Sequence, residues 1–296
     1  MVWTMTDLHA FSSPPPLSDA DLIGHVENIV RRAGTSFFWA MRRLPEDKRN
    51  AMYAIYAFCR EVDDIVDEPG EVAEKKLELG VWRGEIERLF ADRPRNPTAS
   101  ALRRPVEQFD LRKADFHAVI DGMEMDAAPR VRIRDMPELE LYCDRVACAV
   151  GRLSVRVFGI PEDLGIRLAF AQGQALQLTN ILRDIVEDAT RDRLYLPFDV
   201  LQSYGLATEN LTELVNDPML ASVCDLLGNV ASRRFDEAWQ LARQCDRDPV
   251  RPAVMMMAVY QQILNKLIRR GWSDPVRPVR LNRMEKAWTM VRYGLL

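Results

Sequence analysis

The chain has 296 residues, enough for one large domain or two small ones with a buried core. Forty basic residues against forty-four acidic ones give a formal charge of −4, and no basic block predicts nucleic-acid binding. Five cysteines without a C-x-x-C pair argue against a disulfide scaffold or zinc ribbon, and favour a reducing compartment.

Neither a histidine site nor a membrane span is indicated. His9, His25 and His117 are scattered along the chain, which gives little support for a histidine metal centre or a Ser-His-Asp triad. The start of the sequence lacks the basic and apolar regions of a signal peptide, and no window approaches the roughly 18 apolar residues of a membrane span. We therefore expect a soluble, cytoplasmic protein.

Helix signals follow one another along the chain. Residues 1–17 are predicted to be a flexible lead-in, Ser18 to cap a helix that ends at Arg32, and Thr35–Trp39 to begin a short segment after Gly34. Further helices are predicted over Glu46–Glu68, Glu71–Phe90, Thr98–Phe109, Lys113–Asp126, Pro137–Phe158, Pro161–Thr190, Phe198–Tyr204, Asp217–Gln244, Pro249–Arg270 and Arg283–Tyr293. Strand signals are nearly absent, so we predict a single all-α domain over residues 18–296.

The predicted helix after Pro161 carries a polar stripe in the sequence Q-L-T-N-I-L-R-D-I-V-E-D. Asn180, Asp184 and Asp188 are spaced i, i+4, i+8 and lie on one face of a helix, with Gln177 one turn earlier. The other positions are mainly apolar, so the stripe is predicted to face an interior cavity. Two desolvated carboxylates need a cation between them, which could be an arginine or a metal ion.

A second stripe ends the predicted helix Glu46–Glu68. Asp63 and Asp67 are again four residues apart, Arg60 lies one turn earlier and Tyr56 two turns before Asp63. Asp64 lies at the edge of this stripe. The remaining faces are apolar, so two long helices each present a D-x-x-x-D pattern to the interior.

Three interpretations of the paired stripes compete. Each stripe could be a solvated face, which explains most isolated D-x-x-x-D matches. A carboxylate-bridged di-iron site needs Glu-x-x-His pairs, and the sequence contains none. Magnesium held against a diphosphate prefers oxygen ligands, so Asp and Asn without His or Cys suit it better than zinc or iron.

The ordered set of motifs resembles the squalene/phytoene synthase family. The resemblance extends from about Gly34 to Lys266 and depends on F-C-R-E-V-D-D-I-V-D-E, on Y-C-D-R-V-A-C-A-V-G, and on Q-L-T-N-I-L-R-D-I-V-E-D followed by R-L-Y-L-P. The stretches A-M-Y-A-I-Y-A-F-C-R-E-V-D-D and G-M-E-M-D are most similar to the sequences of the bacterial branch that makes presqualene diphosphate for squalene and hopanoids.

The resemblance implies a class I isoprenoid synthase fold, a helical bundle around a central cavity. It implies a prenyltransferase that condenses two farnesyl diphosphates head to head, with several Mg²⁺ ions and release of pyrophosphate. Phytoene or dehydrosqualene synthesis is the alternative, because chain length depends on cavity depth. A non-catalytic assembly factor is a remote third interpretation, which the two complete aspartate motifs disfavour. No G-x-G-x-x-G motif is present, and NADPH is not expected.

The resemblance also implies roles for single residues. The predicted magnesium ligands are Asp63, Asp64, Asp67, Asn180, Asp184 and Asp188. Diphosphate-binding roles fall on Arg60, Arg183 and Tyr260. Tyr142 matches a tyrosine near the reacting carbons, and Gln177 a residue that lines the cavity. Phe37, Tyr56 and Tyr142 could stabilise a carbocation, although core packing explains most aromatic residues. Either Tyr142 or the departing pyrophosphate could assist the final proton loss.

Two departures from the family pattern change these expectations. Cys148 replaces a glycine that is frequent in relatives, and packing explains it better than redox chemistry. The segment Gly34–Phe37 offers only Thr35 and Ser36 where some relatives carry a diphosphate-binding lysine. Arg42, Arg43 or Arg193 would then neutralise the diphosphates.

Because the implied substrate and product are hydrophobic, we expect the protein to contact the cytoplasmic membrane peripherally and to contact other enzymes of the pathway. The predicted helix Glu71–Phe90 is a candidate membrane surface, and a solvated exterior face is the alternative.

Overall fold

The computed structural model describes residues 17–34, 37–206, 209–275 and 278–282, together with residues 284, 285, 288, 289 and 292. Residues 1–16 of the predicted lead-in over residues 1–17 lie outside the described residues, as do Thr35, Ser36 and the side chain of Phe37. The predicted helix Arg283–Tyr293 falls partly outside them.

The described chain is built almost entirely of helices. They are α1 (Asp19–Ala33), α2 (Phe37–Met41), α3 (Glu46–Asp67), α4 (Val72–Phe90), α5 (Pro97–Gln108), α6 (Lys113–Asp126), α7 (Met136–Cys143), the π-helical turn η1 (Asp144–Cys148), α8 (Ala149–Phe158), α9 (Glu162–Thr190), α10 (Phe198–Ser203), α11 (Leu211–Asn216), α12 (Leu220–Ala242) and α13 (Arg247–Arg270). The predicted all-α class is confirmed. No helix in the described ranges is both long enough and apolar enough to cross a bilayer.

The structure corrects the predicted elements in three places. The helix predicted over Pro137–Phe158 is interrupted by η1, because one extra residue is fitted into the turn between α7 and α8. Two short parallel strands, β1 (Val131–Arg132) and β2 (Arg193–Leu194), were not predicted, since two residues carry no periodic signal. Helix α11 was also missed, and α12 begins three residues later than the prediction.

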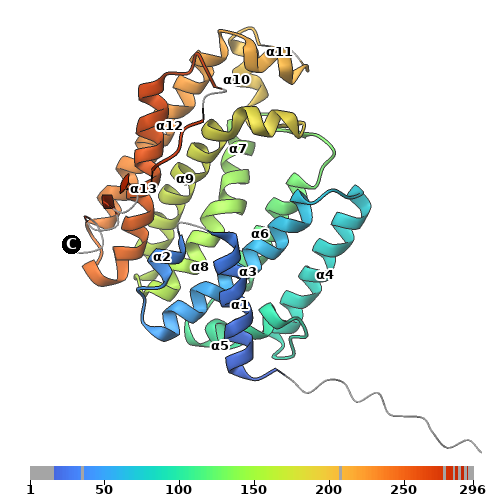
Figure 1. The fold of residues 1–296 in the computed structure, drawn as a ribbon, viewed down its shortest axis with the longest axis vertical. Coiled ribbons are helices and arrows are strands. Elements are labelled where there is room, and N and C mark those ends of the chain that lie inside the picture. The colour runs from blue at the N-terminus through green and yellow to red at the C-terminus, as the bar shows by residue number, and fades with distance from the viewer. Residues whose placement is uncertain are drawn as a thin grey trace, which may run out of the picture.

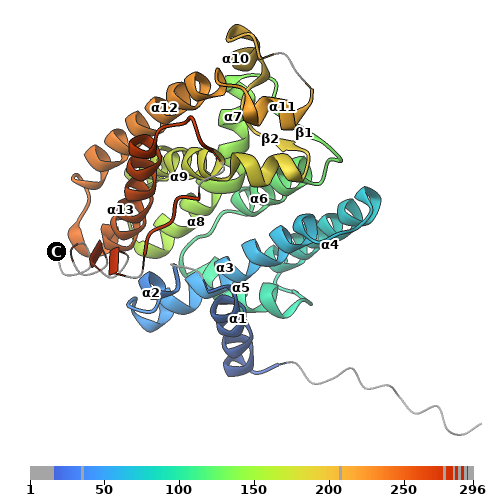
Figure 2. The ribbon, with the colours of Figure 1, turned by 45° about the horizontal axis from the view of Figure 1, so that its top comes forward.

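Helix α9 runs through the middle of the molecule. It packs against α8, η1, α12 and α13, while α3 packs against α1, α5, α6 and α8 (Figure 1). The turned view separates the group formed by α1, α3, α4 and α5 from the group formed by α7, α8, α9, α12 and α13 (Figure 2). The acidic stripe of α3 belongs to the first group and that of α9 to the second.

Aromatic packing holds α3 against its neighbours. The fully buried ring of Phe58 lies 5.3 Å from Trp82 of α4 and 5.2 Å from Phe116 of α6, both edge to face. Such pairs contribute about 0.5–1.5 kcal/mol each beyond the apolar area that they bury. These contacts are on the far side of α3 from its acidic stripe and hold the helix in place.

Two glycines allow η1 to approach the neighbouring helices closely. A Cβ on Gly122 of α6 would lie 2.6 Å from Val146 Cγ1, and a Cβ on Gly173 of α9 would lie 2.7 Å from the Cα of Cys148. Cys148 is fully buried, its thiol donates to the Phe170 carbonyl at 3.4 Å, and burial raises its pKa to about 12. A neutral, enclosed thiol has a packing role, as the sequence suggested.

Candidate functional site

The α3 stripe meets arginines from two directions. Arg60, one turn earlier, forms an ion pair with Asp64 and lies 3.5 Å from Asp63. Arg193 Nη1 lies 2.9 Å from Asp67 Oδ1, and Arg191 Nη1 lies 3.4 Å from the same oxygen. Burial, then the charge of Asp67, raises the pKa of Asp63 to about 6, against the opposing effect of Arg60. Guanidinium groups therefore compensate most of this stripe.

The unpredicted strand pair places Arg193. Val131 of β1 pairs with Arg193 of β2, and Arg193 Nη2 donates to the Val66 carbonyl at 3.0 Å, so the end of α3 and β2 are tied together. Arg132, the second residue of β1, donates from Nη1 to the Asp192 carbonyl at 2.7 Å and supports the turn that leads into β2. Arg193, one of the three arginines predicted to neutralise the diphosphates, thus lies at the end of the α3 stripe, paired with Asp67.

The α9 stripe is compensated differently. Arg183 holds Asp184 with two hydrogen bonds, of 2.7 and 2.5 Å. No hydrogen bond or ion pair to the carboxylate of Asp188 exists among the residues that the structure describes. Burial, then the charge of Asp184, raises the pKa of Asp188 to about 7, although Arg193 opposes that rise. Asp188 is thus the acid of the two stripes whose ionised form is least well stabilised.

Asn180 completes the α9 stripe and carries an unsatisfied atom. Its Nδ2 donates to Gln177 Oε1 at 3.3 Å, while its Oδ1 is buried without a hydrogen-bond partner in the described part of the chain. An unpaired buried oxygen costs about 1–3 kcal/mol, so it is expected to receive a ligand. Tyr260 of α13 lies beside Asn180 and Arg183, and burial raises its pKa.

The donor set suits magnesium, provided that a phosphate completes the coordination. Within the described ranges, no three acidic, histidine or cysteine side chains converge on a single point, so the protein alone forms no closed metal cage. Magnesium is usually held by one or two carboxylates together with substrate phosphates, and each stripe offers such a pair. Asn180 Oδ1 has no hydrogen-bond partner among the described residues, and the pKa values of Asp63 and Asp188 are raised. Both properties suit oxygen atoms that a bound cation would stabilise.

A buried tyrosine pair lies beneath the two stripes. The Tyr142 hydroxyl donates to Asp126 Oδ2 at 3.0 Å and the Tyr195 hydroxyl to Asp126 Oδ1 at 2.8 Å, with the two rings stacked at 4.8 Å. Burial raises the pKa of Asp126 to about 6 and that of Tyr142 well above its usual value. The charges of Asp63 and Arg193 act on Asp126, and Asp126 in turn acts on Asp188.

Asp126 and Tyr195 were not assigned to the site from the sequence. Both stand in motifs that carried the family resemblance, Asp126 in G-M-E-M-D and Tyr195 in R-L-Y-L-P, which is the signal that could have identified them. Tyr142 was predicted, and the structure places it in this cluster.

An apolar cavity of about 250 Å³ opens beside the α9 stripe. It lies between α2, α3, η1, α8, α9 and α13, and its polar lining consists of Ser154, Gln172, Gln177, Asn180 and Tyr260. Apolar side chains supply most of the remaining wall, among them Met41, Met52, Val150, Phe158, Leu176 and Met256. Gln177, predicted to line a cavity, is among the residues around this one, whereas Tyr56 and Tyr142 are not.

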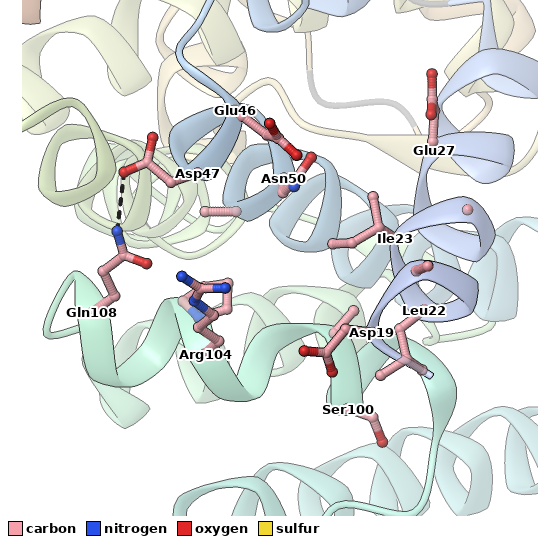
Figure 3. A pocket seen from close by; sticks show the side chains of 15 residues that line it. Asp19, Leu22, Ile23, Glu27, Glu46, Asp47, Asn50, Ser100, Arg104 and Gln108 are labelled. Carbon is pink, nitrogen blue, oxygen red and sulfur yellow. Dashed lines mark hydrogen bonds between the residues drawn. The ribbon is translucent and has the colours of Figure 1, made fainter. Parts of the chain in front are cut away.

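A larger hollow of about 840 Å³ lies elsewhere, between α1, α3 and α5 (Figure 3). It surrounds Glu46, Asp47 and Asn50 at the start of α3, with Gln108 donating to Asp47 at 3.0 Å. Since an α-helix rises 1.5 Å per residue, Asp67 is about 25–30 Å from this hollow along the axis of α3. The larger hollow is therefore separate from the acidic stripes.

The chain is similar to known proteins along most of its length. The model of the squalene/phytoene synthase family matches residues 30–285. Presqualene diphosphate synthase of Rhodopseudomonas palustris is 43% identical over 263 residues, covering 89% of this chain and 94% of that protein. The enzyme of the same name from Sinorhizobium fredii is 40% identical over 277 residues, covering 94% and 99%. Phytoene synthases match at 32–33% identity.

A solved structure extends the similarity to the fold. The crystal structure of a dehydrosqualene synthase in complex with a ligand superposes with a TM-score of 0.81 at 25% sequence identity. The match covers 94% of this chain and 96% of that one.

Proposed function

The chain belongs to the squalene/phytoene synthase family, and we propose that it condenses two farnesyl diphosphates into presqualene diphosphate, releasing pyrophosphate. The observation that carries the proposal is the unsatisfied α9 stripe, with Asp188 and Asn180 Oδ1 lacking partners among the described residues, beside an apolar cavity. A prenyl diphosphate bound together with metal cations fits both features, because the cations meet the oxygens of the stripe and the hydrocarbon tail meets the apolar wall. The 40–43% identity to proteins named presqualene diphosphate synthase, against 32–33% for phytoene synthases, supports this product over the alternative.

Two sets of side chains would hold Mg²⁺ in this enzyme. On α9 they are Asn180, Asp184 and Asp188, and on α3 they are Asp63 and Asp67, with Asp64 at the edge where Arg60 engages it. When bound, the metal supplies Lewis-acid stabilisation of the negative charge that develops on the departing pyrophosphate.

Arginines that now bind carboxylates would bind the diphosphates. Arg183 is held by Asp184 and Arg193 by Asp67, so both guanidinium groups already lie at the stripes. The planar fork of each arginine is suited to phosphate oxygens, and both would be available to the diphosphates where Mg²⁺ neutralises the carboxylates. Arg60 and Tyr260 would add a further cation and a hydroxyl donor from α3 and α13.

The apolar cavity would hold a prenyl chain and exclude water. A farnesyl cation must meet the double bond of the second substrate before it meets water, and a wall made mainly of Met, Val, Leu and Phe side chains leaves little room for water. The polar side chains at the Asn180 end keep the diphosphate next to the metal ligands while the hydrocarbon lies deeper.

Tyr142 is better suited to hold its proton than to remove one. Its hydroxyl hydrogen is engaged by Asp126, and burial keeps its pKa well above the usual value. Its ring stacks on Tyr195 and does not line the apolar cavity. The departing pyrophosphate then is the base that takes the proton when the cyclopropane closes.

Product analysis tests the proposal. Purified protein incubated with farnesyl diphosphate and Mg²⁺, without NADPH, should release pyrophosphate and form a cyclopropyl diphosphate with thirty carbons, and adding NADPH should leave that product unreduced. Phytoene formed only from geranylgeranyl diphosphate would replace the proposal with carotenoid synthesis. No turnover of either substrate would favour a non-catalytic role.

A further inference from the structure

Arg193 differs from the other arginines at the stripes in the element that carries it. Arg60 lies on α3, which has 22 residues, and Arg183 on α9, which has 29, so a long helix fixes the backbone at both positions. Arg193 begins the strand β2, which has two residues and pairs with β1 over two residues. A two-stranded ladder this short is marginal by itself. The position of Arg193 therefore depends on further contacts.

Tyr195 supplies such a contact from the same side of the segment. Arg193 and Tyr195 are two positions apart, so in an extended backbone their side chains point the same way. Arg193 Nη1 donates to Asp67 Oδ1 at 2.9 Å, and the Tyr195 hydroxyl donates to Asp126 Oδ1 at 2.8 Å. One side of this short segment is thus anchored at two points, to the end of α3 and to the end of α6.

The carboxylate that receives Tyr195 is buried and engaged at both oxygens. Asp126 is only 7% exposed, and its second oxygen accepts from the Tyr142 hydroxyl at 3.0 Å. Burial raises the pKa of Asp126 to about 6 and that of Tyr195 above its usual range, and the positive charge of Arg193 opposes both increases. Arg193 is therefore close enough to this cluster for their charges to interact. Asp126 joins α6, α7 and the segment after β2 at one point.

We infer that Asp126 is a positioning residue for Arg193. By holding the Tyr195 hydroxyl, it fixes the segment from which Arg193 reaches the end of α3. A guanidinium group held in place before a ligand arrives loses less conformational freedom when it binds that ligand. That the ligand is a diphosphate rests on the proposed function.

A second buried carboxylate on α6 provides an internal comparison. Asp115 is 6% exposed and accepts from Arg152 Nε at 2.5 Å, which ties α6 to α8. It lies eleven residues before Asp126, about 16 Å away along the helix axis. Asp115 thus resembles Asp126 in burial and in joining helices, but it holds no arginine of the acidic stripes. A variant of Asp115 separates loss of stability from loss of positioning.

Titration of the full chain with inorganic pyrophosphate and Mg²⁺, followed by calorimetry, tests this inference without requiring turnover. Tyr195→Phe keeps the aromatic ring and removes the hydroxyl donor, and it should weaken pyrophosphate binding about tenfold. In an Arg193→Leu background, the same substitution should change the affinity by no more than about twofold, because the arginine that it positions is absent. Asp115→Asn should bind pyrophosphate like the parent, even where its Tm is lower.

The type of substitution at Asp126 separates its hydrogen bonds from its charge. Asp126→Asn keeps one acceptor oxygen and should lose less pyrophosphate affinity than Asp126→Leu, which keeps none. Equal losses in these two variants would assign the effect to charge and overturn the inference. If Asp126→Leu does not fold, as circular dichroism would show, the Tyr195 and Arg193 variants decide alone.

Two further outcomes would overturn the inference. Parental pyrophosphate affinity in Tyr195→Phe would mean that the hydroxyl bond does not position Arg193. An equal loss from Tyr195→Phe with and without Arg193 would mean that the effect does not pass through this arginine. Turnover of farnesyl diphosphate by the parent is measured in parallel. Intact pyrophosphate binding without turnover would refute the proposed function alone, so the two failures are distinguishable.

Discussion

The acidic stripes on α3 and α9 share their spacing and differ in their partners. On α3, Asp67 is paired with Arg193 at 2.9 Å and Asp64 with Arg60, so guanidinium groups from the protein neutralise the stripe. On α9, Arg183 pairs with Asp184, while Asp188 and the Oδ1 of Asn180 have no partner among the described residues. Two carboxylates one turn apart repel each other in both places.

The difference indicates where the ligand contributes most. Arginines relieve the repulsion on α3 in the protein itself, whereas the α9 stripe retains part of it until a cation arrives. Asp188 is therefore the position at which a bound cation would most stabilise the ionised carboxylate. Variants that remove a carboxylate from the α9 stripe, or an arginine partner from the α3 stripe, test this difference.

The largest effect is expected from removing either carboxylate of the α9 stripe. Asp188→Ala and Asp184→Ala should each lower kcat/KM for farnesyl diphosphate by about 10³-fold, because a ligand of the ion that stabilises the leaving group is lost. Circular dichroism should show an unchanged helical fold. Asp163→Ala, which removes an exposed acid from the first turn of the same helix, should retain parental activity. Parental activity in Asp184→Ala would contradict the assignment of α9 as a metal-binding stripe.

A smaller effect is expected when α3 is made to resemble α9. Arg193→Leu leaves Asp67 without its closest cation and removes a proposed diphosphate ligand, so kcat/KM should fall about 10- to 100-fold. Arg191→Leu is the matched control, since Arg191 lies farther from Asp67, at 3.4 Å, and its side chain is 46% exposed against 14% for Arg193. It should lose no more than about twofold. Equal losses in the two variants would mean that general positive charge, rather than the position of Arg193, matters.

The parts of this site that follow from local spacing were predictable, and those that depend on distant contacts were not. Asn180, Asp184 and Asp188 form a stripe because of helical periodicity alone, and the structure brings them together as predicted. Arg193 meets Asp67 across 126 residues through a strand pair too short to produce a pattern. Tyr195 reaches Asp126 across 69 residues, and nothing in either segment alone indicates the partner.

The smallest effect concerns the stability of metal-free protein and distinguishes the stripes by pH. The pKa of Asp188 is raised to about 7 and that of Asp63 to about 6, above the ordinary value of 3.8 in the unfolded chain. A carboxyl whose pKa is raised by folding favours the folded state at low pH, and this contribution is lost as the pH rises through the folded value. In EDTA, the protein should therefore lose stability as the pH rises from about 4 to about 7, the interval between the unfolded and folded pKa values.

Asparagine at either position removes the charge and should raise the Tm of metal-free protein at the alkaline end of that range. The gain should be larger for Asp188→Asn than for Asp63→Asn, because Arg60 and Arg193 both oppose the rise at Asp63 and only Arg193 opposes it at Asp188. Each 1 kcal/mol gained corresponds to about 2–4 °C in a domain of this size, which differential scanning calorimetry resolves. The control variant Asp163→Asn changes an exposed side chain and should leave the Tm unchanged at both ends of the pH range. Equal gains at the two stripes would mean that their arginine partners do not make the difference proposed for α3 and α9.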